Sequence, residues 1–278
     1  MDRNAADGGA NPPVCATAEV LHNGMLSPQY GRVALVCPEA FETAEPGQFL
    51  MLGFPESADP LLRRPYSIHA LSRLGGRATG VEILYKVVGP ATRRLSGLRP
   101  GDAASILGPL GKGFRIPAGV RRLFLAAGGV GIAPFRLLLD RLEAAGRPAI
   151  DCRLFFGVRT AEELLCVRDI EARGIPVLCT TEDGSAGAHC RVTDPLSEAI
   201  DREPPDLVLA CGPRPMLSCV AEITRRRRVP CQISLEERMA CGMGACLGCA
   251  VPARGKGGPR FHHACVDGPV FDVEEIEL

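Results

Sequence analysis

The first part of the chain alternates apolar and polar positions with the two-residue period of β-strands. Residues 32–37 (RVALVC) and 81–87 (VEILYKV) show this period most clearly, and proline and glycine residues separate such runs. Many short strands in about a hundred residues are typical of a small antiparallel barrel. We therefore predict an all-β domain, an N-terminal antiparallel β-barrel, over residues 15–116.

The hydrophobic pattern changes near residue 117. Short, mostly apolar runs follow at residues 123–127, 153–157, 176–179 and 206–210. Segments with helical spacing lie between them, and the first carries Phe135, Leu138 and Leu142 on one face. Because buried strands that alternate with helices form a parallel sheet covered on both faces, residues 117–232 are predicted to form a central α/β nucleotide-binding domain.

The two ends of the chain differ from these segments. After residue 232 the composition turns to glycine and cysteine, which predicts a small C-terminal metal-binding lobe over residues 233–278. The first 14 residues are polar and glycine-rich and are predicted to be disordered. They lack the charged-then-apolar pattern of a secretory signal.

Composition limits the function classes. Of the 278 residues, 46% are hydrophobic and 23% charged, with a net charge of zero, so we expect a soluble protein without a nucleic-acid or acidic-membrane surface. The most apolar stretch, residues 123–139, is interrupted by glycines, Pro134 and Arg136 and makes a poor membrane span. Thirteen cysteines without a signal peptide favour the reducing cytoplasm.

Four of the cysteines follow the spacing C-x4-C-x2-C-x15-C, at Cys241, Cys246, Cys249 and Cys265. The first three match the plant-type 2Fe–2S arrangement, in which the fourth cysteine comes from later in the chain. A loop that wraps such a cluster needs conformational freedom, which Gly242, Gly244 and Gly248 provide. A structural zinc site and four unrelated buried thiols are the alternatives, although zinc sites usually combine two C-x2-C pairs.

A glycine-rich turn at residues 128–134 (GGVGIAP) joins a predicted strand to a predicted helix. Gly128, Gly129 and Gly131 would let the backbone approach a pyrophosphate at the helix N-terminus, where free N–H groups are available. Pro134 suits the first helical turn. The turn lacks the full G-x-G-x-x-G fingerprint, so an ordinary tight turn remains an alternative.

A second turn, Cys211-Gly212-Pro213, follows a later strand and begins another helix. Its position at a strand end would allow the Cys211 thiol to touch a nicotinamide ring. A small side chain that fills a crowded strand end is the alternative, and for this residue taken alone the better one.

In the barrel half, residues 62–68 read LRRPYSI. An extended backbone would place Arg64 and Tyr66 on one face, where the arginine can grip a pyrophosphate and the tyrosine can stack on a ring. The hydroxyl of Ser67 can bond a ring nitrogen. Downstream, Gly89 and Thr92 could contact phosphate, while a basic exposed strand and an ordinary turn are the alternatives.

In this order, the motifs resemble the ferredoxin–NADP reductase superfamily. The C-terminal cysteines narrow the resemblance to electron-transfer subunits of type B, NAD-dependent dihydroorotate dehydrogenase. The likeness runs from about Cys15 to Phe271, and it includes residues 46–49 (PGQF), 107–114 (LGPLGKGF) and 265–271 (CVDGPVF).

The resemblance implies three redox carriers. Arg64, Tyr66, Ser67, Gly89 and Thr92 would hold FAD, Gly128, Gly129, Gly131 and Cys211 would face NAD, and the four cysteines would ligate the 2Fe–2S cluster. A separate FMN-containing catalytic subunit would oxidise dihydroorotate in pyrimidine biosynthesis, in a heterotetramer, and the electrons would leave as hydride to NAD+. No residue of this chain is expected to act as acid or base on the organic substrate. Pro90-Ala91 departs from the family, whose members more often have a second glycine there.

Two other functions fit the same motifs. A related subunit could serve an NAD(P)H–ferredoxin reductase or a hydrogenase. Arg153 and Arg159 near a strand end could contact a 2′-phosphate, but solvated arginines are the better interpretation. A non-catalytic, zinc-containing redox-sensing module is the alternative from another class. It would be colourless, whereas a flavin and a cluster would colour the protein.

Overall fold

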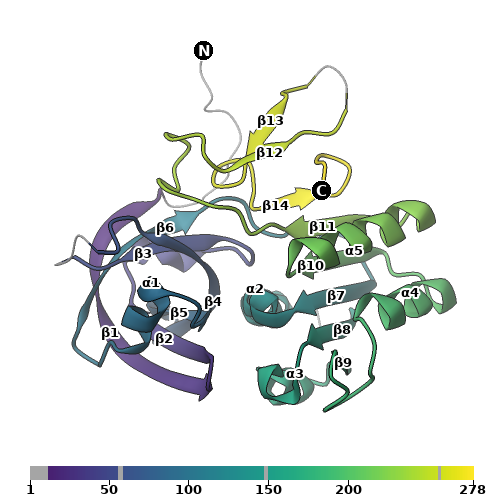
Figure 1. Cartoon of the computed structure of the whole chain (residues 1–278), viewed down its shortest axis with the longest axis horizontal. Coiled ribbons are helices and arrows are strands. Elements are labelled where there is room, and N and C mark those ends of the chain that lie inside the picture. The colour runs from purple at the N-terminus through teal and green to yellow at the C-terminus, as the bar shows by residue number, and fades with distance from the viewer. Residues whose placement is uncertain (1–11, 56–58, 147–149, 256–257) are drawn as a thin grey trace.

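The computed structural model describes residues 12–55, 59–146, 150–255 and 258–278. It consists of a β-barrel, an α/β unit beside it, and a smaller C-terminal lobe above both (Figure 1). The predicted fold class is confirmed by this arrangement. Most of the predicted disordered N-terminus, residues 1–11, lies outside the described residues.

Six antiparallel strands close the barrel in the order β1-β2-β5-β4-β3-β6. Their inward positions carry the alternating apolar residues, such as Val33, Leu35 and Ile83, none of which is exposed to solvent. The strands are β1 (Val14–Ser27), β2 (Tyr30–Val36), β3 (Phe49–Gly53), β4 (Arg64–Leu74), β5 (Arg77–Lys86) and β6 (Ala103–Leu110). The short helices η1 (Glu39–Thr43) and α1 (Pro90–Ser96) connect them.

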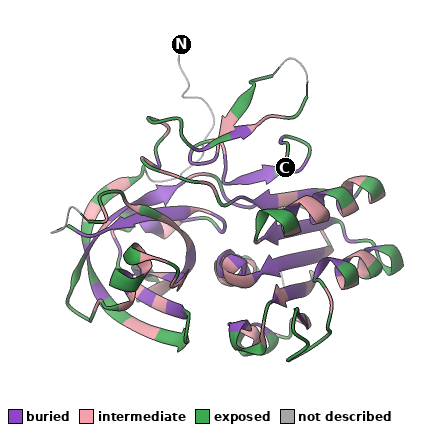
Figure 2. Ribbon diagram, viewed as in Figure 1, coloured by how far each residue is buried: buried purple, intermediate pink, exposed green. Residues whose placement is uncertain are grey.

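A six-stranded sheet in the order β14-β11-β10-β7-β8-β9 forms the second unit. Its strands are buried and its helices expose their outer faces (Figure 2). The parallel strands are β7 (Arg122–Gly128), β8 (Asp151–Val158), β9 (Val177–Thr181), β10 (Leu207–Cys211) and β11 (Cys231–Ser234). The helices are η2 (Gly129–Ile132), α2 (Ala133–Ala144), η3 (Ala161–Glu163), α3 (Val167–Glu171), α4 (Thr193–Arg202) and α5 (Arg214–Arg227).

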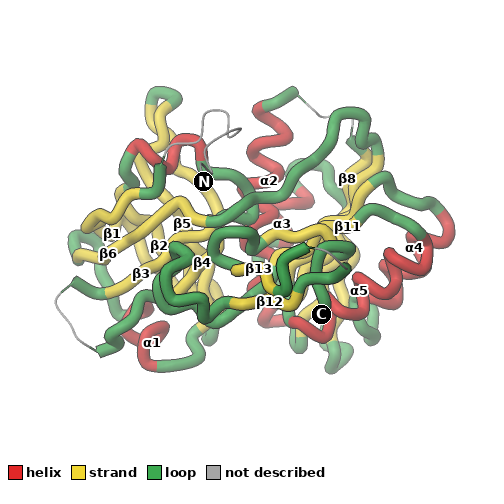
Figure 3. Tube along the Cα trace, turned by 90° about the horizontal axis from the view of Figure 1, so that it is seen from above, coloured by secondary structure: helices red, strands yellow, loops and turns green. Residues whose placement is uncertain are grey.

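The C-terminal segment is divided between a lobe and the sheet. Strands β12 (Ala250–Pro252) and β13 (Phe261–His263) form a separate hairpin, whereas β14 (Val270–Asp272) pairs antiparallel with β11 and extends the nucleotide-domain sheet. Seen from above, the hairpin lies over the junction of the barrel and the sheet (Figure 3). The C-terminal lobe is therefore tied to the α/β unit by the backbone hydrogen bonds between β14 and β11.

Candidate functional site

A cavity of about 1430 Å³ opens between the barrel and the carboxyl ends of the parallel strands. In open α/β sheets this edge is where nucleotides bind. Its wall includes residues from β4, from the turns after β7 and β10, and from the segment that leads into the cysteine loop. All nine cofactor-binding residues predicted from sequence line it: Arg64, Tyr66, Ser67, Gly89, Thr92, Gly128, Gly129, Gly131 and Cys211.

The glycine turn is wedged against the turn after β10. A Cβ atom on Gly131 would lie 2.2 Å from the carbonyl oxygen of Cys211, and one on Gly128 would lie 2.7 Å from Pro213 Cδ. Gly129 has a φ of +53°, which favours glycine. The three glycines are thus required by close backbone approach and by one left-handed conformation, and they join two separate turns into a single wall of the cavity.

Cys211 lies at the end of β10 with 9% of its surface exposed. Burial raises the pKa of its thiol to about 12, against a smaller opposing effect of a hydrogen bond with Ser234. The thiol is therefore protonated at neutral pH and is not a nucleophile. It offers a small, neutral contact surface to a ligand in the cavity.

On the barrel side, β4 presents Arg64, Tyr66 and Ser67 to the cavity. Burial raises the pKa of Tyr66 to about 12, which keeps the phenol neutral and suits it to stacking. The Arg64 guanidinium donates through Nη1 to the carbonyls of Leu62 and Arg63, at 2.8 and 3.3 Å. The residue is exposed, and its other nitrogens keep donors for an anion.

The turn at residues 88–92 differs in detail from the expected phosphate contact. The hydroxyl of Thr92 accepts hydrogen bonds from the N–H groups of Val88 and Gly89, at 2.8 and 3.0 Å, and caps α1. Pro90 has no N–H. The hydroxyl predicted to bind phosphate is therefore already engaged in the cap of α1.

The four cluster cysteines gather in the loop before β12 and beside β13. Backbone N–H groups point at their sulfurs: Met243 and Cys246 donate to Cys241 Sγ at 3.4 Å, and Gly244 donates to Cys265 Sγ at 3.2 Å. Gly242 and Gly244 have φ of +75° and +80°, which this inward turning of the amides requires. Such N–H···S contacts stabilise thiolates and tune iron–sulfur clusters.

The thiols are associated in two pairs, Cys241 with Cys246 and Cys249 with Cys265. Burial opposes ionisation of Cys241, but the amides of Met243 and Cys246 prevail and lower its pKa to about 6. Burial and the adjoining Cys249 raise the pKa of Cys265 to about 12. Among the described residues, no three His, Cys, Asp or Glu side chains are grouped as ligands of one metal ion. Two thiol pairs fit a cluster in which four cysteines serve two irons.

Some cavity residues were missed from sequence. Glu163, which is 7% exposed, accepts from Lys86 at 3.3 Å and is paired with Arg159, so it forms an ionic bridge between the barrel and the α/β unit. Glu182 also lines the cavity, at the end of β9. The sequence signal for Lys86 was its position at the end of an alternating strand, three residues before Gly89. Arg153, by contrast, is not among the described lining residues and pairs with Glu203 at 2.5 Å.

Comparisons with known proteins agree with this geometry. Residues 236–277 match the family described as the iron-sulfur cluster binding domain of dihydroorotate dehydrogenase B, and residues 125–222 match the oxidoreductase NAD-binding domain. A Desulforamulus reducens protein named dihydroorotate dehydrogenase B (NAD(+)), electron transfer subunit, is 36% identical over 93% of this chain and 97% of its own length. A protein of the same name from Caldanaerobacter subterraneus subsp. tengcongensis is 40% identical over 83% of this chain and 86% of its own length.

Solved structures share the fold. An NADH-dependent reduced ferredoxin–NADP oxidoreductase, studied for flavin-based electron bifurcation, has a TM-score of 0.79 and 28% identity over 98% of this chain and 91% of that one. A ferredoxin NADP+ reductase from Neisseria gonorrhoeae has a TM-score of 0.64 and 21% identity over 76% of this chain and 91% of that one, and it supports the fold alone. No helix in the described ranges is long and apolar enough to cross a membrane.

Proposed function

The chain belongs to the family of electron-transfer subunits of NAD-dependent dihydroorotate dehydrogenase B, and we propose that it carries electrons from a catalytic partner subunit to NAD+. The partner is expected to contain FMN and to oxidise dihydroorotate, in a heterotetramer. We further propose that residues 15–116 bind FAD, residues 117–232 bind NAD and residues 233–278 bind the 2Fe–2S cluster. A cytoplasmic location fits thirteen cysteines that are all unpaired by disulfides.

One observation carries this proposal: the approach to the cysteine loop forms part of the cavity wall. Met239, Ala240 and Gly248 line the cavity together with Tyr66 of the barrel and Cys211 of the α/β unit. A ring stacked on Tyr66 would therefore lie between the cluster loop and the nicotinamide side. FAD held there by Arg64 and Tyr66 would supply the change from one-electron transfer at the cluster to two-electron hydride transfer at the nicotinamide.

The residues present fit these groups. Tyr66 provides a neutral ring face, Arg64 provides donors for a pyrophosphate, and Gly128, Gly129 and Gly131 expose backbone in the wall of the cavity. The thiol pairs provide four sulfur ligands, and backbone amides are directed at the sulfurs of Cys241, Cys249 and Cys265. The chain's own task in the reaction is to hold these partners at fixed separations and to exclude water from the space between them.

The acidic groups of the cavity favour NAD over NADP. Glu182 lies at the end of β9, and Glu163 is paired with both Lys86 and Arg159, which leaves one net positive charge in this group of three. A free ribose 2′-hydroxyl can donate a hydrogen bond to the Glu182 carboxylate, whereas a 2′-phosphate has no proton to donate and is repelled by it. We therefore assign NAD as the nucleotide of this cavity.

Replacing Tyr66 by alanine is expected to weaken FAD binding, because it removes the ring face. Stacking of a base on an aromatic side chain contributes about 1–3 kcal/mol, which corresponds to about a 5- to 150-fold rise in the dissociation constant. Tyr66→Phe keeps the ring and is expected to retain most of the affinity. Fluorescence quenching of FAD measures both variants, and equal losses for phenylalanine and alanine would contradict a stacking role.

Exposed apolar side chains surround the accessible edge of the cysteine loop. Met243, Leu247 and Val266 are 56%, 58% and 46% exposed, and Cys246 between them is exposed as well. A Cβ atom on Gly244 would lie 2.8 Å from Val266, so the two parts of this surface are in contact. An apolar rim around a redox centre is suited to a partner that must approach closely, and we propose it as the docking surface for the catalytic subunit.

Leu247→Glu is expected to weaken assembly with the catalytic subunit by at least about tenfold, because the interface would bury a charge without a partner. Leu74→Glu is the matched control, since Leu74 is 77% exposed and lies at the far end of a barrel hairpin. Analytical ultracentrifugation of the two-subunit mixture measures the effect. Equal assembly of both variants would place the docking surface elsewhere.

The function itself is tested with the co-purified pair of subunits. We expect yellow-brown protein with iron, acid-labile sulfide and flavin, and we expect dihydroorotate to drive reduction of NAD+ but not of NADP+. Reduction of ferredoxin or NADP+ alone would favour a different reductase subunit. Colourless protein with zinc-bound thiols would overturn the proposal.

A further inference from the structure

The first residue of helix α2 is bonded to the barrel by a buried histidine. The Nδ1 atom of His69, on β4, lies 2.8 Å from the carbonyl oxygen of Ala133, and the histidine is 1% exposed. A carbonyl can only accept, so Nδ1 carries the proton and Nε2 is left as an acceptor, 4.0 Å from the Cys166 sulfur. Burial lowers the pKa of His69, which keeps the ring neutral and this tautomer in place.

The bond joins the two walls of the cavity over a short path. His69 lies two residues beyond Ser67 on the strand that faces the flavin side, and Ala133 lies two residues beyond Gly131 of the nucleotide turn. The turn is held on its other side by the Cys211 backbone. A shift of His69 relative to Ala133 would therefore be transmitted directly to the separation between flavin and nicotinamide.

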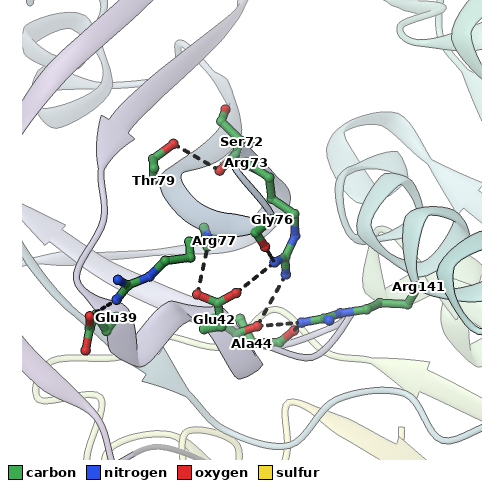
Figure 4. Close-up of polar contacts among 10 residues, drawn as sticks. Glu39, Glu42, Ala44, Ser72, Arg73, Gly76, Arg77, Thr79 and Arg141 are labelled. Carbon is green, nitrogen blue, oxygen red and sulfur yellow. Dashed lines mark hydrogen bonds and ion pairs between the residues drawn. The ribbon is translucent and has the colours of Figure 1, made fainter.

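A second anchor holds the other end of the same helix. The guanidinium of Arg141 donates to the carbonyl oxygens of Glu42 and Ala44, at 3.0 and 2.8 Å, across the boundary between the α/β unit and the barrel (Figure 4). Arg73, near the end of β4, bonds the Glu42 carboxylate at 2.8 Å and fixes that segment. Ala133 and Arg141 are eight residues apart, or about 12 Å along a helix. Two points at this spacing fix the tilt of α2 as well as its position.

We propose that His69 and Arg141 are positioning residues that set the distance for hydride transfer between FAD and NAD. The inference rests on the proposed function and deepens it. His69 acts on the nucleotide turn through the first turn of α2, and Arg141 acts on the orientation of the same helix. Neither side chain takes part in the transfer, in which two electrons and one proton leave NADH together and reduce the flavin while NAD+ is formed.

The test uses the assembled complex and compares His69→Leu with His69→Asn, because the asparagine amide can donate from near the position of Nδ1. At saturating NADH, His69→Leu should slow flavin reduction about 10- to 100-fold, since a displacement of about 1 Å can cost 100-fold. His69→Asn should restore most of the rate. Flavin reduction at the wild-type rate in His69→Leu, or no recovery in His69→Asn, would overturn the role of His69.

Hydrogen exchange supplies a readout that is independent of the redox reaction. Backbone amides of residues 128–136 should exchange faster in His69→Leu than in wild type, with recovery in His69→Asn. If the wild-type complex does not reduce its flavin with NADH, that result counts against the proposed function. The exchange measurement still tests the role of His69 in that case. Unchanged exchange over these residues would show that the histidine does not hold the turn.

Arg141 has a matched control on the same helix. Arg173 also bonds α2, through Asp140 and Glu143 at 2.5 and 2.8 Å, but entirely within the α/β unit. Arg141→Met should therefore slow flavin reduction, whereas Arg173→Met should lower the melting temperature and leave the rate at saturating NADH unchanged. This pair also decides the inference if His69→Leu does not retain FAD. Equal rates in the two arginine variants would overturn it.

Discussion

Cys265→Ser is expected to abolish partner-driven reduction of NAD+ and to leave NADH-driven flavin reduction intact. Cys265 is 2% exposed and is paired with the equally buried Cys249, so solvent has little access to the position that the missing sulfur would leave. Serine is harder to ionise than cysteine and is a poorer ligand for iron. We expect a loss of more than about 100-fold, because disturbing even an outer-shell partner can cost that much in metal affinity.

The separation of the two activities is the informative part of this experiment. Iron and acid-labile sulfide should fall in Cys265→Ser while the flavin content stays at the wild-type level. Cys15→Ser is the control, because Cys15 lies on the first barrel strand and its sulfur accepts a hydrogen bond from Arg63 rather than from an amide of the cysteine loop. Retention of iron and of partner-driven turnover in Cys265→Ser would remove this residue from the ligand set.

Local patterns predicted the elements that neighbouring residues determine. Alternation over residues 32–37 predicted the strand that the structure forms at Tyr30–Val36, and helical spacing predicted the apolar face of α2, because burial on one side leaves a period in the sequence. The cysteine spacing likewise identified a loop whose sulfurs the structure gathers. The strand and helix signals span a few turns, and Cys241, Cys246 and Cys249 lie in one loop. Over such short segments the chain geometry restricts the conformations that are possible.

Contacts between distant segments left no such signal. The bond between His69 and Ala133 joins residues 64 positions apart, and β14 pairs with a strand 39 residues upstream when counted from Cys231 to Val270. The capping role of Thr92 depends on the rotamer of one hydroxyl, so the sequence could place the residue at the cavity without showing that its oxygen is engaged. Which group a side chain takes as its hydrogen-bond partner is decided by packing in the folded protein.

The second large effect is expected at Gly131, where the nucleotide turn meets the end of β10. A Cβ atom there would lie 2.2 Å from the carbonyl oxygen of Cys211, 2.5 Å from its carbonyl carbon and 2.8 Å from the nitrogen of Gly212. All three contacts are to backbone, which cannot rotate away as a side chain can. The two turns must separate by about 1 Å, because a close-packed interior has no space to absorb the overlap.

Gly131→Ala is therefore expected to slow NADH-driven flavin reduction by about 100-fold, since both turns form the wall against which nicotinamide must be aligned. The flavin and cluster sites lie on other segments, so FAD and iron contents should stay near wild type. Gly258→Ala is the control, because a Cβ atom at Gly258 meets nothing within 4 Å. Stopped-flow measurement at saturating NADH separates slow transfer from weak binding. A wild-type rate in Gly131→Ala would mean that nicotinamide does not bind against this turn.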